Sequence, residues 1–355
     1  MTTFLYILLA IFIFGVLIAI HEFGHFVAAK ACGVRVEEFA VGMGPVLWKK
    51  QKGETQYSLR AIPIGGFCAM AGEDEAMDDP RAFTSKPAWK RIIILAAGAF
   101  MNFVLGLVII FFLYINAGGF YVPVLTGFMD GCPYESADGL QAGDQFYSID
   151  GHRIYHTDDV SVFLNRGGDD YDLVLIRDGQ KVRLEDFHMV TLEYEGQEHK
   201  MFGFYLGNGV VPATFSNKLT HTWDTAMDFC RMIWMSLGEL LGGKVSMKEL
   251  SGPVGIVDLM AETGEQAEST ADALFNIFYL AAFVAVNLAI MNLLPIPALD
   301  GGRIFLLLVT WVIEHITRKK LDPKYEGYIH AAGMVLLLAL MAFVMFNDIV
   351  RIIKG

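Results

Sequence analysis

The sequence has little charge and no pattern of paired cysteines. Charged residues make up 19% of its 355 residues, whereas a typical soluble domain carries about 25%. Its hydrophobic content of 54% excludes a disordered chain, because disorder needs low hydrophobicity and high charge. The net charge of −12 argues against a nucleic-acid partner, whose footprint is basic. The four cysteines (Cys32, Cys68, Cys132, Cys230) form no CxxC motif, so they indicate neither a zinc site nor a disulfide framework. Whether Cys132 and Cys230 pair is left open.

Long stretches of the chain lack charge altogether. A helix of about 20 apolar residues crosses the hydrocarbon core of a bilayer. We therefore predict a polytopic α-helical membrane protein with four transmembrane helices. The first segment has no basic start and its apolar run is too long for a signal peptide, so we expect an uncleaved anchor. The shorter run Ile304–Ile313 favours a half-helix or an interfacial helix. The four windows without Asp, Glu, Lys or Arg are Thr2–Ile20, Ile92–Met129, Ala273–Leu299 and Gly327–Asn347, and the predicted helices lie at roughly 4–28, 92–116, 274–293 and 328–347.

The positive charges are distributed unevenly between these helices. Residues 30–91 hold ten Lys and Arg, and the short segment before the last helix holds four more. Residues 117–222 hold seven, against sixteen Asp and Glu. Because cytoplasmic loops are rich in Lys and Arg, we expect the first two segments inside and residues 117–222 outside. Arg351 and Lys354, near a C-terminus predicted to lie outside, fit this orientation less well.

Residues 117–212 are predicted to form a small β-rich domain. Short β-prone runs such as Tyr171–Ile176 and Lys181–Leu184 are separated by turn signals. The stretch Ala137–Ile154 contains a Gly-Leu-x-x-Gly-Asp turn, a short strand and Asp-Gly, and it resembles the signature of PDZ domains. Such a domain either binds peptide C-termini or extended segments by strand addition, or only packs and excludes bulky substrates. Residues 213–272 are amphipathic and favour a connecting segment with an interfacial helix.

The strongest chemical motif is His21-Glu22-Phe23-Gly24-His25 at the end of the first apolar segment. Residues four apart share one face of a helix. His21 and His25 can therefore bind one zinc ion, with Glu22 beside it as general base. Ionisable groups at membrane depth are costly and indicate function. The alternative is an inert, hydrogen-bonded histidine pair at the membrane surface.

A catalytic zinc usually has three protein ligands and one open position, so a third ligand is required. The best candidate is Asp300, which follows Pro295 and Pro297 in the stretch 292–302. The prolines must break or unwind the third helix, and Gly301 and Gly302 are expected to keep the next turn flexible. Broken backbone at membrane depth is tolerated where it lines a cavity. Asp300 would then face a wet pocket, or alternatively it only caps the next helix.

Three asparagines lie in or beside the apolar segments. Asn292 could donate a hydrogen bond to the oxyanion of the tetrahedral intermediate, or it could satisfy backbone groups that the prolines leave unpaired. Asn102 and Asn287 are expected to bridge helices.

These motifs together resemble the site-2 protease family of intramembrane zinc metalloproteases, and within it the RseP-like regulators of sigma-factor signalling. The HExxH of residues 21–25 matches the family's first motif, and the NxxPxPxLDG of residues 292–301 matches its second. The resemblance covers nearly the whole chain. It implies Zn²⁺ as cofactor, with His21, His25 and Asp300 as ligands, Glu22 as catalytic acid and base, and Asn292 and Pro295 as substrate-handling residues.

The resemblance also implies an architecture and a class of substrate. Residues 1–116 would hold two transmembrane helices and a membrane-associated β-hairpin, because 39–45 and 62–67 resemble the family's hairpin segments. Residues 273–355 would hold the other two helices, in the bacterial inner membrane with zinc near its cytoplasmic side. Partners would be the bilayer and single-span membrane proteins, such as an anti-sigma factor or a remnant signal peptide. Many relatives have two PDZ domains, but residues 117–212 have room for one.

Two other functions are weighed against proteolysis. A scaffold that only binds peptides through its outer domain would not need Glu22 beside two histidines at ligand spacing. A metal transporter usually shows internal repeats and several intramembrane acids, and the sequence shows neither.

Overall fold

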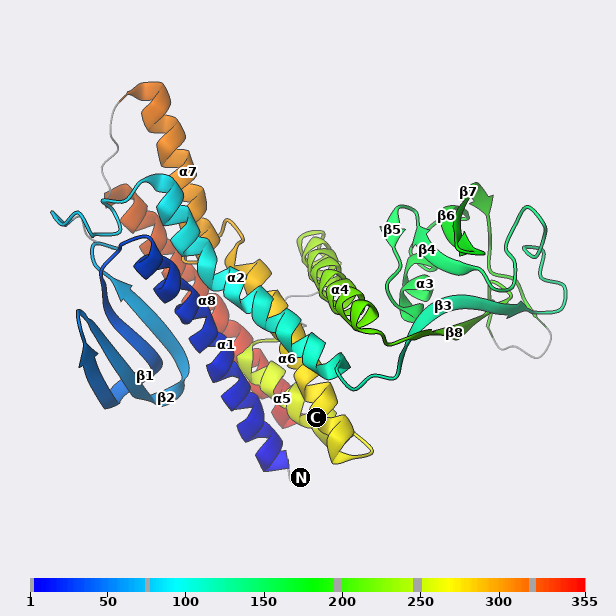
Figure 1. Ribbon diagram of the computed structural model, residues 1–355, viewed down its shortest axis with the longest axis horizontal. Helices are drawn as coiled ribbons and strands as arrows, with labels where there is room; N and C mark the ends of the chain where they lie inside the picture. The colour runs from blue at the N-terminus through cyan, green and yellow to red at the C-terminus, as the bar shows by residue number, and fades with distance from the viewer. Residues whose placement is uncertain (1–2, 74–76, 195–198, 245–250, 319–323, 355) are drawn as a thin grey trace. The chain divides into compact units, whose positions relative to one another are not determined.

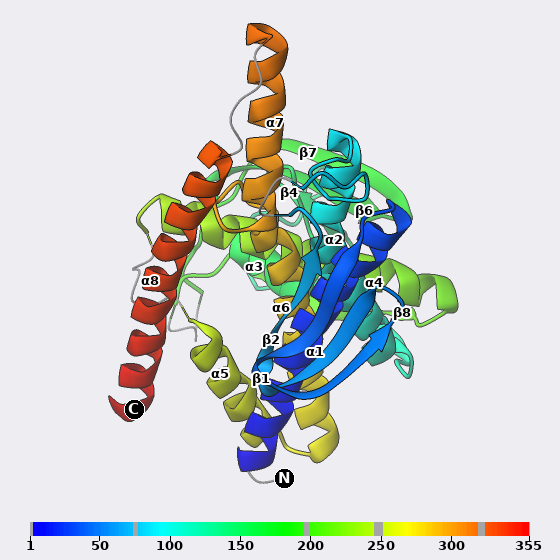
Figure 2. The same ribbon diagram turned by 90° about the vertical axis from the view of Figure 1, so that its left-hand side faces the viewer.

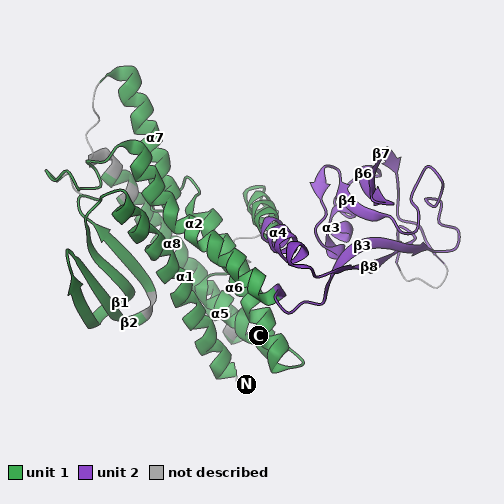
Figure 3. Cartoon of the chain, viewed as in Figure 1, with its two compact units in different colours: residues 1–113, 229–355 green, residues 114–228 purple. Residues whose placement is uncertain are grey.

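The computed structural model describes residues 3–73, 77–194, 199–244, 251–318 and 324–354 (Figure 1). They form two compact units (Figure 3): unit 1 comprises residues 1–113 and 229–355, and unit 2 comprises residues 114–228. Helix α4 (Phe215–Leu241) begins in unit 2 and ends in unit 1. The other elements of unit 1 are α1 (Thr3–Ala31), β1 (Val36–Lys52), β2 (Thr55–Met70), α2 (Ala88–Tyr114), α5 (Pro253–Glu265), α6 (Thr270–Asn292), α7 (Asp300–Thr317) and α8 (Lys324–Lys354).

Four helices among the described residues are long and apolar enough to cross a membrane: α1, α2, α6 and Gly327–Arg351 of α8. The prediction of four spans is confirmed at this level of length and composition. Their surfaces carry large apolar side chains, and Phe12, Phe112 and Leu336 are each more than 60% exposed. Such a surface is suited to lipid rather than to water. Helix α7 is longer than the apolar run that predicted it, because it continues into polar residues at both ends.

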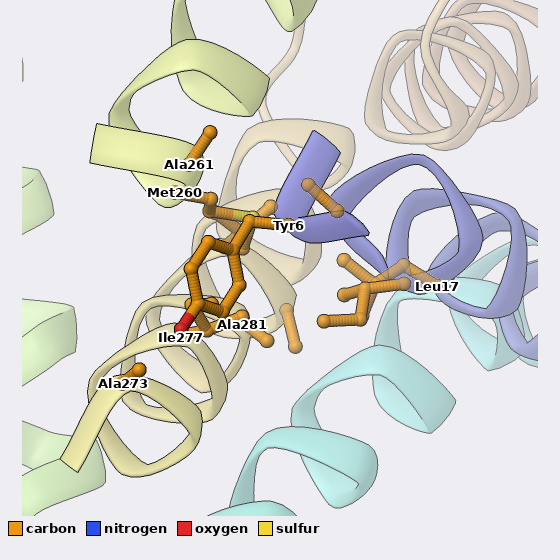
Figure 4. Packing of buried hydrophobic residues seen from close by; sticks show 11 residues of the cluster. Tyr6, Leu17, Met260, Ala261, Ala273, Ile277 and Ala281 are labelled. Carbon is orange, nitrogen blue, oxygen red and sulfur yellow. The ribbon is translucent and has the colours of Figure 1, made fainter. Parts of the chain in front are cut away.

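The core of unit 1 joins α1, α5 and α6. Tyr6 and Leu17 of α1 pack with Met260 of α5 and Ile277 of α6 (Figure 4). Apart from Ile13 and Val284, the other buried residues of this cluster are alanines, which allow the helices to approach closely. The cluster holds α1 between Tyr6 and Leu17, in the part of the helix that leads to the HExxH residues.

Strands β1 and β2 form an antiparallel hairpin beside α1 (Figure 2). A second cluster, which includes Ala29, Val36, Cys68 and Ile94, ties the base of this hairpin to the ends of α1 and α2. The hairpin exposes large apolar side chains away from this base: Met43, Leu47, Trp48, Leu59 and Ile62.

Unit 2 is a six-stranded sheet with strand order β7-β6-β4-β3-β8, in which β5 pairs with β4. The Gly-Leu-x-x-Gly-Asp turn anchors this sheet. Leu140 and Asp144 of the turn are fully buried, and Asp144 accepts two hydrogen bonds from Arg177, at 2.7 and 2.8 Å. The assignment as a PDZ domain stays a prediction. The elements of unit 2 are β3 (Gly119–Phe128), β4 (Gln145–Ile149), β5 (His152–Arg153), α3 (Thr157–Leu164), β6 (Asp170–Arg177), β7 (Gln180–His188), β8 (Phe204–Pro212) and the first half of α4.

The first half of α4 packs into unit 2. Thr225 and Ala226 are fully buried, and the ring of His221 stacks on Phe120 of β3 with centroids 4.1 Å apart. Several large apolar side chains of α4 stay exposed, among them Phe215, Trp223 and Trp234, and the interfacial helix stays a prediction.

Candidate active site

The two histidines of the HExxH motif lie one turn apart on α1 and face the same point. Their Nε2 atoms are 3.1 Å apart, and their rings meet edge to face with centroids 4.8 Å apart. His25 is buried, and its Nδ1 lies 2.8 Å from the carbonyl oxygen of Ile94 in α2. A carbonyl can only accept, so Nδ1 of His25 carries the proton and its Nε2 presents a lone pair.

Asp300 is the first residue of α7 and turns its carboxylate toward the histidines. Its Oδ2 lies 3.2 Å from Nε2 of His21 and 3.4 Å from Nε2 of His25. The N-cap of α7 is Leu299, without a side-chain cap. The carboxylate of Asp300 is thus directed to the histidines by the helix start.

The loop between α6 and α7 brings Asp300 to this position. It is tightly packed rather than flexible, which corrects the expectation for the glycines. A Cβ at Gly301 would lie 2.2 Å from the carbonyl oxygen of Leu293, and a Cβ at Gly302 would lie 2.1 Å from that of Ile296. Ala298 has φ of 81°, a conformation rare for a residue with a side chain. The surrounding contacts therefore hold a strained loop in one shape.

The three ligand-type atoms fit a metal ion. Ligand atoms about 2.0–2.2 Å from a tetrahedral zinc lie roughly 3.3–3.6 Å from one another, and the three distances here are 3.1, 3.2 and 3.4 Å. Oδ2 of Asp300 is also buried without a hydrogen bond of acceptable geometry. A buried carboxylate oxygen without such a bond is costly, and its convergence with the Nε2 atoms of both histidines fits a cation between them.

Glu22 lies beside this triangle and is held by the hairpin. The backbone N–H of Cys68 in β2 donates a hydrogen bond to its carboxylate. A Cβ at Gly66 of the same strand would come within 3.3 Å of Cγ of Glu22. The hairpin therefore forms one wall of the site.

Two residues of α2 belong to the site although the sequence did not assign them to it. A Cβ at Gly98 would lie 2.4 Å from Nε2 of His25 and 2.8 Å from Nε2 of His21, so only glycine leaves room for both rings. Asn102, which we expected to bridge helices, places Nδ2 3.4 Å from Nδ1 of His21. The sequence signal that could have indicated them is a glycine and an asparagine four residues apart, on one face of an otherwise apolar helix.

The remaining predicted residues lie at the end of α6. Nδ2 of Asn292 is 3.5 Å from Nδ1 of His21, so Asn292 joins the site. Pro295 is exposed in the loop that follows, and no contact places it against the three ligand-type residues.

An HExxH helix that faces an aspartate, on helices apolar enough to span a membrane, is the arrangement of a membrane-embedded metallopeptidase. The sequence profile of Peptidase family M50 matches residues 9–340. The chain belongs to this family, and the resemblance to site-2 proteases is thereby confirmed.

Individual relatives agree with this membership. A protein of Clostridium perfringens named "putative zinc metalloprotease" is 35% identical, with 98% of this chain and 99% of the relative covered. The "regulator of sigma-W protease RasP" of Bacillus subtilis is 30% identical, covering 96% and 97%. The "zinc metalloprotease RasP" of Bacillus licheniformis is also 30% identical, covering 96% and 98%. The predicted class, a zinc metallopeptidase, is confirmed by the family and these names.

Proposed function

We propose that this chain is an intramembrane zinc metalloendopeptidase that hydrolyses peptide bonds within or near the transmembrane segments of single-span membrane proteins. The observation that supports this most strongly is the convergence of His21, His25 and Asp300 beside Glu22. The four helices that are apolar enough to span a membrane support a site at membrane depth, which favours a membrane-embedded substrate over a soluble one.

In this proposal His21, His25 and Asp300 hold the zinc ion, and Glu22 is the catalytic acid and base. Zinc bound there supplies a water that is acidic near neutral pH and a Lewis acid for the scissile carbonyl. Glu22 accepts the proton of the attacking water and passes it to the leaving amine. The Cys68 amide that donates to Glu22 holds this carboxylate against the hairpin, beside the histidines.

Asn292 and Pro295 are proposed to handle the substrate. The Asn292 amide, at the edge of the site, offers an N–H to the oxyanion that develops during attack. Pro295 ends α6 shortly after Asn292 and lies exposed. A substrate backbone would meet it on the way to Asp300.

The hairpin is proposed to hold the substrate in an extended form. A peptide bond inside a helix is shielded by its own hydrogen bonds, so the substrate must unwind before a carbonyl is accessible. Within the described chain β1 and β2 pair only with each other, and a free sheet edge can accept an added strand. β2 passes directly against Glu22. The exposed Leu47 and Trp48 suit insertion of this hairpin into the membrane surface.

The proposed setting is the bacterial inner membrane, with the zinc site near the cytoplasmic side and unit 2 outside. Lys49, Lys50 and Lys52 follow the exposed apolar residues of the hairpin, as expected for a cytoplasmic surface. Unit 2 would bind peptide C-termini or gate access. Because a relative is named "regulator of sigma-W protease RasP", a membrane-anchored sigma-factor regulator is one proposed substrate class, and a remnant signal peptide is another.

Cleavage by purified protein tests the proposal. The protein in proteoliposomes would be incubated with a single-span model substrate, and the products would be identified by mass spectrometry. We expect the wild type to cut within or near the span. Glu22→Gln should reduce the rate by about 10²–10⁴-fold while zinc remains bound, because Glu22 is not a ligand. Glu37→Gln, an exposed carboxylate of β1, is the matched control and should cleave normally.

The metal ligands are tested separately by zinc content. Asp300→Ala should lose zinc on dialysis under conditions in which the wild type retains one ion per chain, since two histidines remain. Full zinc content in Asp300→Ala would refute its role as a ligand. Zinc-loaded wild type that cuts no single-span substrate would instead refute the assigned substrate class.

A further inference from the structure

Two asparagine side chains approach the same nitrogen of His21. Nδ2 of Asn102 in α2 lies 3.4 Å from Nδ1 of His21, and Nδ2 of Asn292 in α6 lies 3.5 Å from it. Nδ1 has room for one in-plane hydrogen bond. The two amides therefore cannot have the same role at this ring.

The tautomer of His21 decides what Nδ1 needs. In the proposed zinc centre, Nε2 of His21 faces His25 and Asp300 and must present its lone pair there. Nδ1 then carries the proton and has to donate it. An amide NH2 can only donate, so an amide nitrogen beside Nδ1 would place two N–H donors face to face without an acceptor. The oxygen and nitrogen of an amide have nearly the same shape, and their assignment follows from the hydrogen-bond network. One of the two amides must therefore present its oxygen.

Burial distinguishes the two asparagines. Asn102 is 1% exposed, and its Oδ1 is buried without a hydrogen-bond partner. A half-turn of this amide gives the orphaned oxygen a donor and removes the conflict at Nδ1. Asn292 is only half-buried, at the end of α6 where the loop to Asp300 begins, and its oxygen is not among the buried atoms without a partner.

We propose that the Asn102 amide oxygen accepts the Nδ1 proton of His21 and so fixes the ring with Nε2 toward the metal, which leaves the Asn292 amide free for substrate. Asn102 is thus a positioning residue, and it does for His21 what the Ile94 carbonyl does for His25. The inference rests on the proposed zinc centre.

Zinc dissociation tests this assignment without measuring proteolysis. Asn102→Leu has a similar size and cannot accept, whereas Asn102→Asp retains an acceptor. Loss of an acceptor behind a zinc-bound histidine weakens the metal by about 10–100-fold. We expect that loss for Asn102→Leu in competition with a chelator, and near wild-type zinc affinity for Asn102→Asp. Asn292→Leu is the matched variant at the second amide near Nδ1 of His21 and should retain near wild-type zinc affinity.

Equal zinc affinity in Asn102→Leu and wild type would overturn the inference, as would a loss confined to Asn292→Leu. If Asn102→Leu does not fold, NMR spectra of the cobalt-substituted wild type and of cobalt-substituted Asn102→Asp still test the inference. Each should show two exchangeable imidazole N–H signals, and the aspartate should shift one of them strongly while leaving the other, from His25, in place. Two unshifted signals would overturn the inference. A wild type that binds neither metal would instead refute the proposed zinc centre itself.

Discussion

Gly98 of α2 lies directly against the imidazole of His25. A Cβ built on Gly98 would come within 2.4 Å of Nε2 of His25, and within 2.7 Å of Cε1 of His21. Helices α1 and α2 approach equally closely at the preceding residue of each helix. A Cβ at Gly24 would lie 2.3 Å from the carbonyl oxygen of Ala97. The crossing of α1 and α2 thus depends on glycine, and it sets the space in which both rings turn toward Asp300.

Gly98→Ala is therefore expected to disturb the metal site before it disturbs the fold. One methyl group at this position must displace at least one imidazole, since the backbone of both helices is fixed by packing. We expect zinc affinity to fall by at least about tenfold, as for other changes that misplace a ligand. Competition with a fluorescent chelator would measure this.

Gly238→Ala serves as the control for that experiment. A Cβ at Gly238 of α4 meets nothing within 4 Å, and replacing an exposed helical glycine by alanine stabilises a helix by about 0.4–1 kcal/mol. Its zinc affinity should equal that of the wild type. If Gly98→Ala retained wild-type zinc affinity as well, the close contact would have no consequence for the rings.

Local sequence patterns predicted the existence of the helices and the pairing of His21 with His25. They predicted less well where the helices end and which other residues surround the site. The spacing of His21 and His25 is a property of one helix turn, so the sequence was sufficient to place them together. The predicted span at 92–116 is observed as Ala88–Tyr114, because the helix continues through Lys90 and Arg91 although the uncharged window begins after them. Windows of hydropathy report solubility in lipid, whereas backbone hydrogen bonds decide where a helix ends.

Contacts between distant parts of the chain had no comparable signal. Asn102 meets His21 across 81 positions of sequence, and nothing in the residues between them indicates that α2 crosses α1 at this point. The same limit applies to α4. The amphipathic pattern of α4 was visible in the sequence, but such a pattern does not say whether the apolar face meets lipid or protein. The burial of Thr225 and Ala226 likewise depends on tertiary packing.

The ion pair of Asp144 and Arg177 is expected to stabilise unit 2. Asp144 is fully buried, and Arg177 donates to both of its oxygens while also donating to the carbonyl of Gly139. Removing one partner of a buried pair costs about 3–5 kcal/mol, because the other charge is left uncompensated. Arg177→Met should therefore lower the stability of unit 2 markedly in denaturant titrations. The double variant Arg177→Met with Asp144→Leu should be less destabilised than Arg177→Met alone, and equal losses would contradict the explanation by uncompensated charge.

Asp348 of α8 is expected to hold α8 to the start of α5. Its carboxylate is fully buried and accepts hydrogen bonds from the backbone N–H groups of Gly252 and Gly255, at 3.0 and 2.9 Å. Asp348→Ala would leave two donors at a helix N-terminus without a partner, which costs about 1–3 kcal/mol. Hydrogen exchange of the first turn of α5 should accelerate accordingly. Arg351→Gln removes the more exposed partner of Asp348 and should change exchange little; a larger effect from Arg351→Gln would show that the ion pair, not the cap, is the important contact.

His221 makes the attachment of α4 within unit 2 sensitive to pH. Burial against Phe120 disfavours the imidazolium and lowers the pKa of His221 below its ordinary value of 6.5, although Asp224 opposes this. The unfolded state then binds more protons than the folded state between the lowered pKa and 6.5. The contribution of His221 to stability is thus fully present above about pH 6.5 and falls as the pH drops through that window. Burial also raises the pKa of Asp224 above 3.8, and this shift changes stability with pH in the opposite direction.

The variant His221→Phe isolates this effect, because phenylalanine can keep the stacking on Phe120 but cannot titrate. Hydrogen exchange of the β3 and α4 amides would be measured at about pH 7.5 and about pH 5.5, corrected for intrinsic exchange. The wild type should lose protection at the lower pH, and His221→Phe should lose less. Equal losses in the two proteins would mean that another group, and not His221, carries the pH dependence.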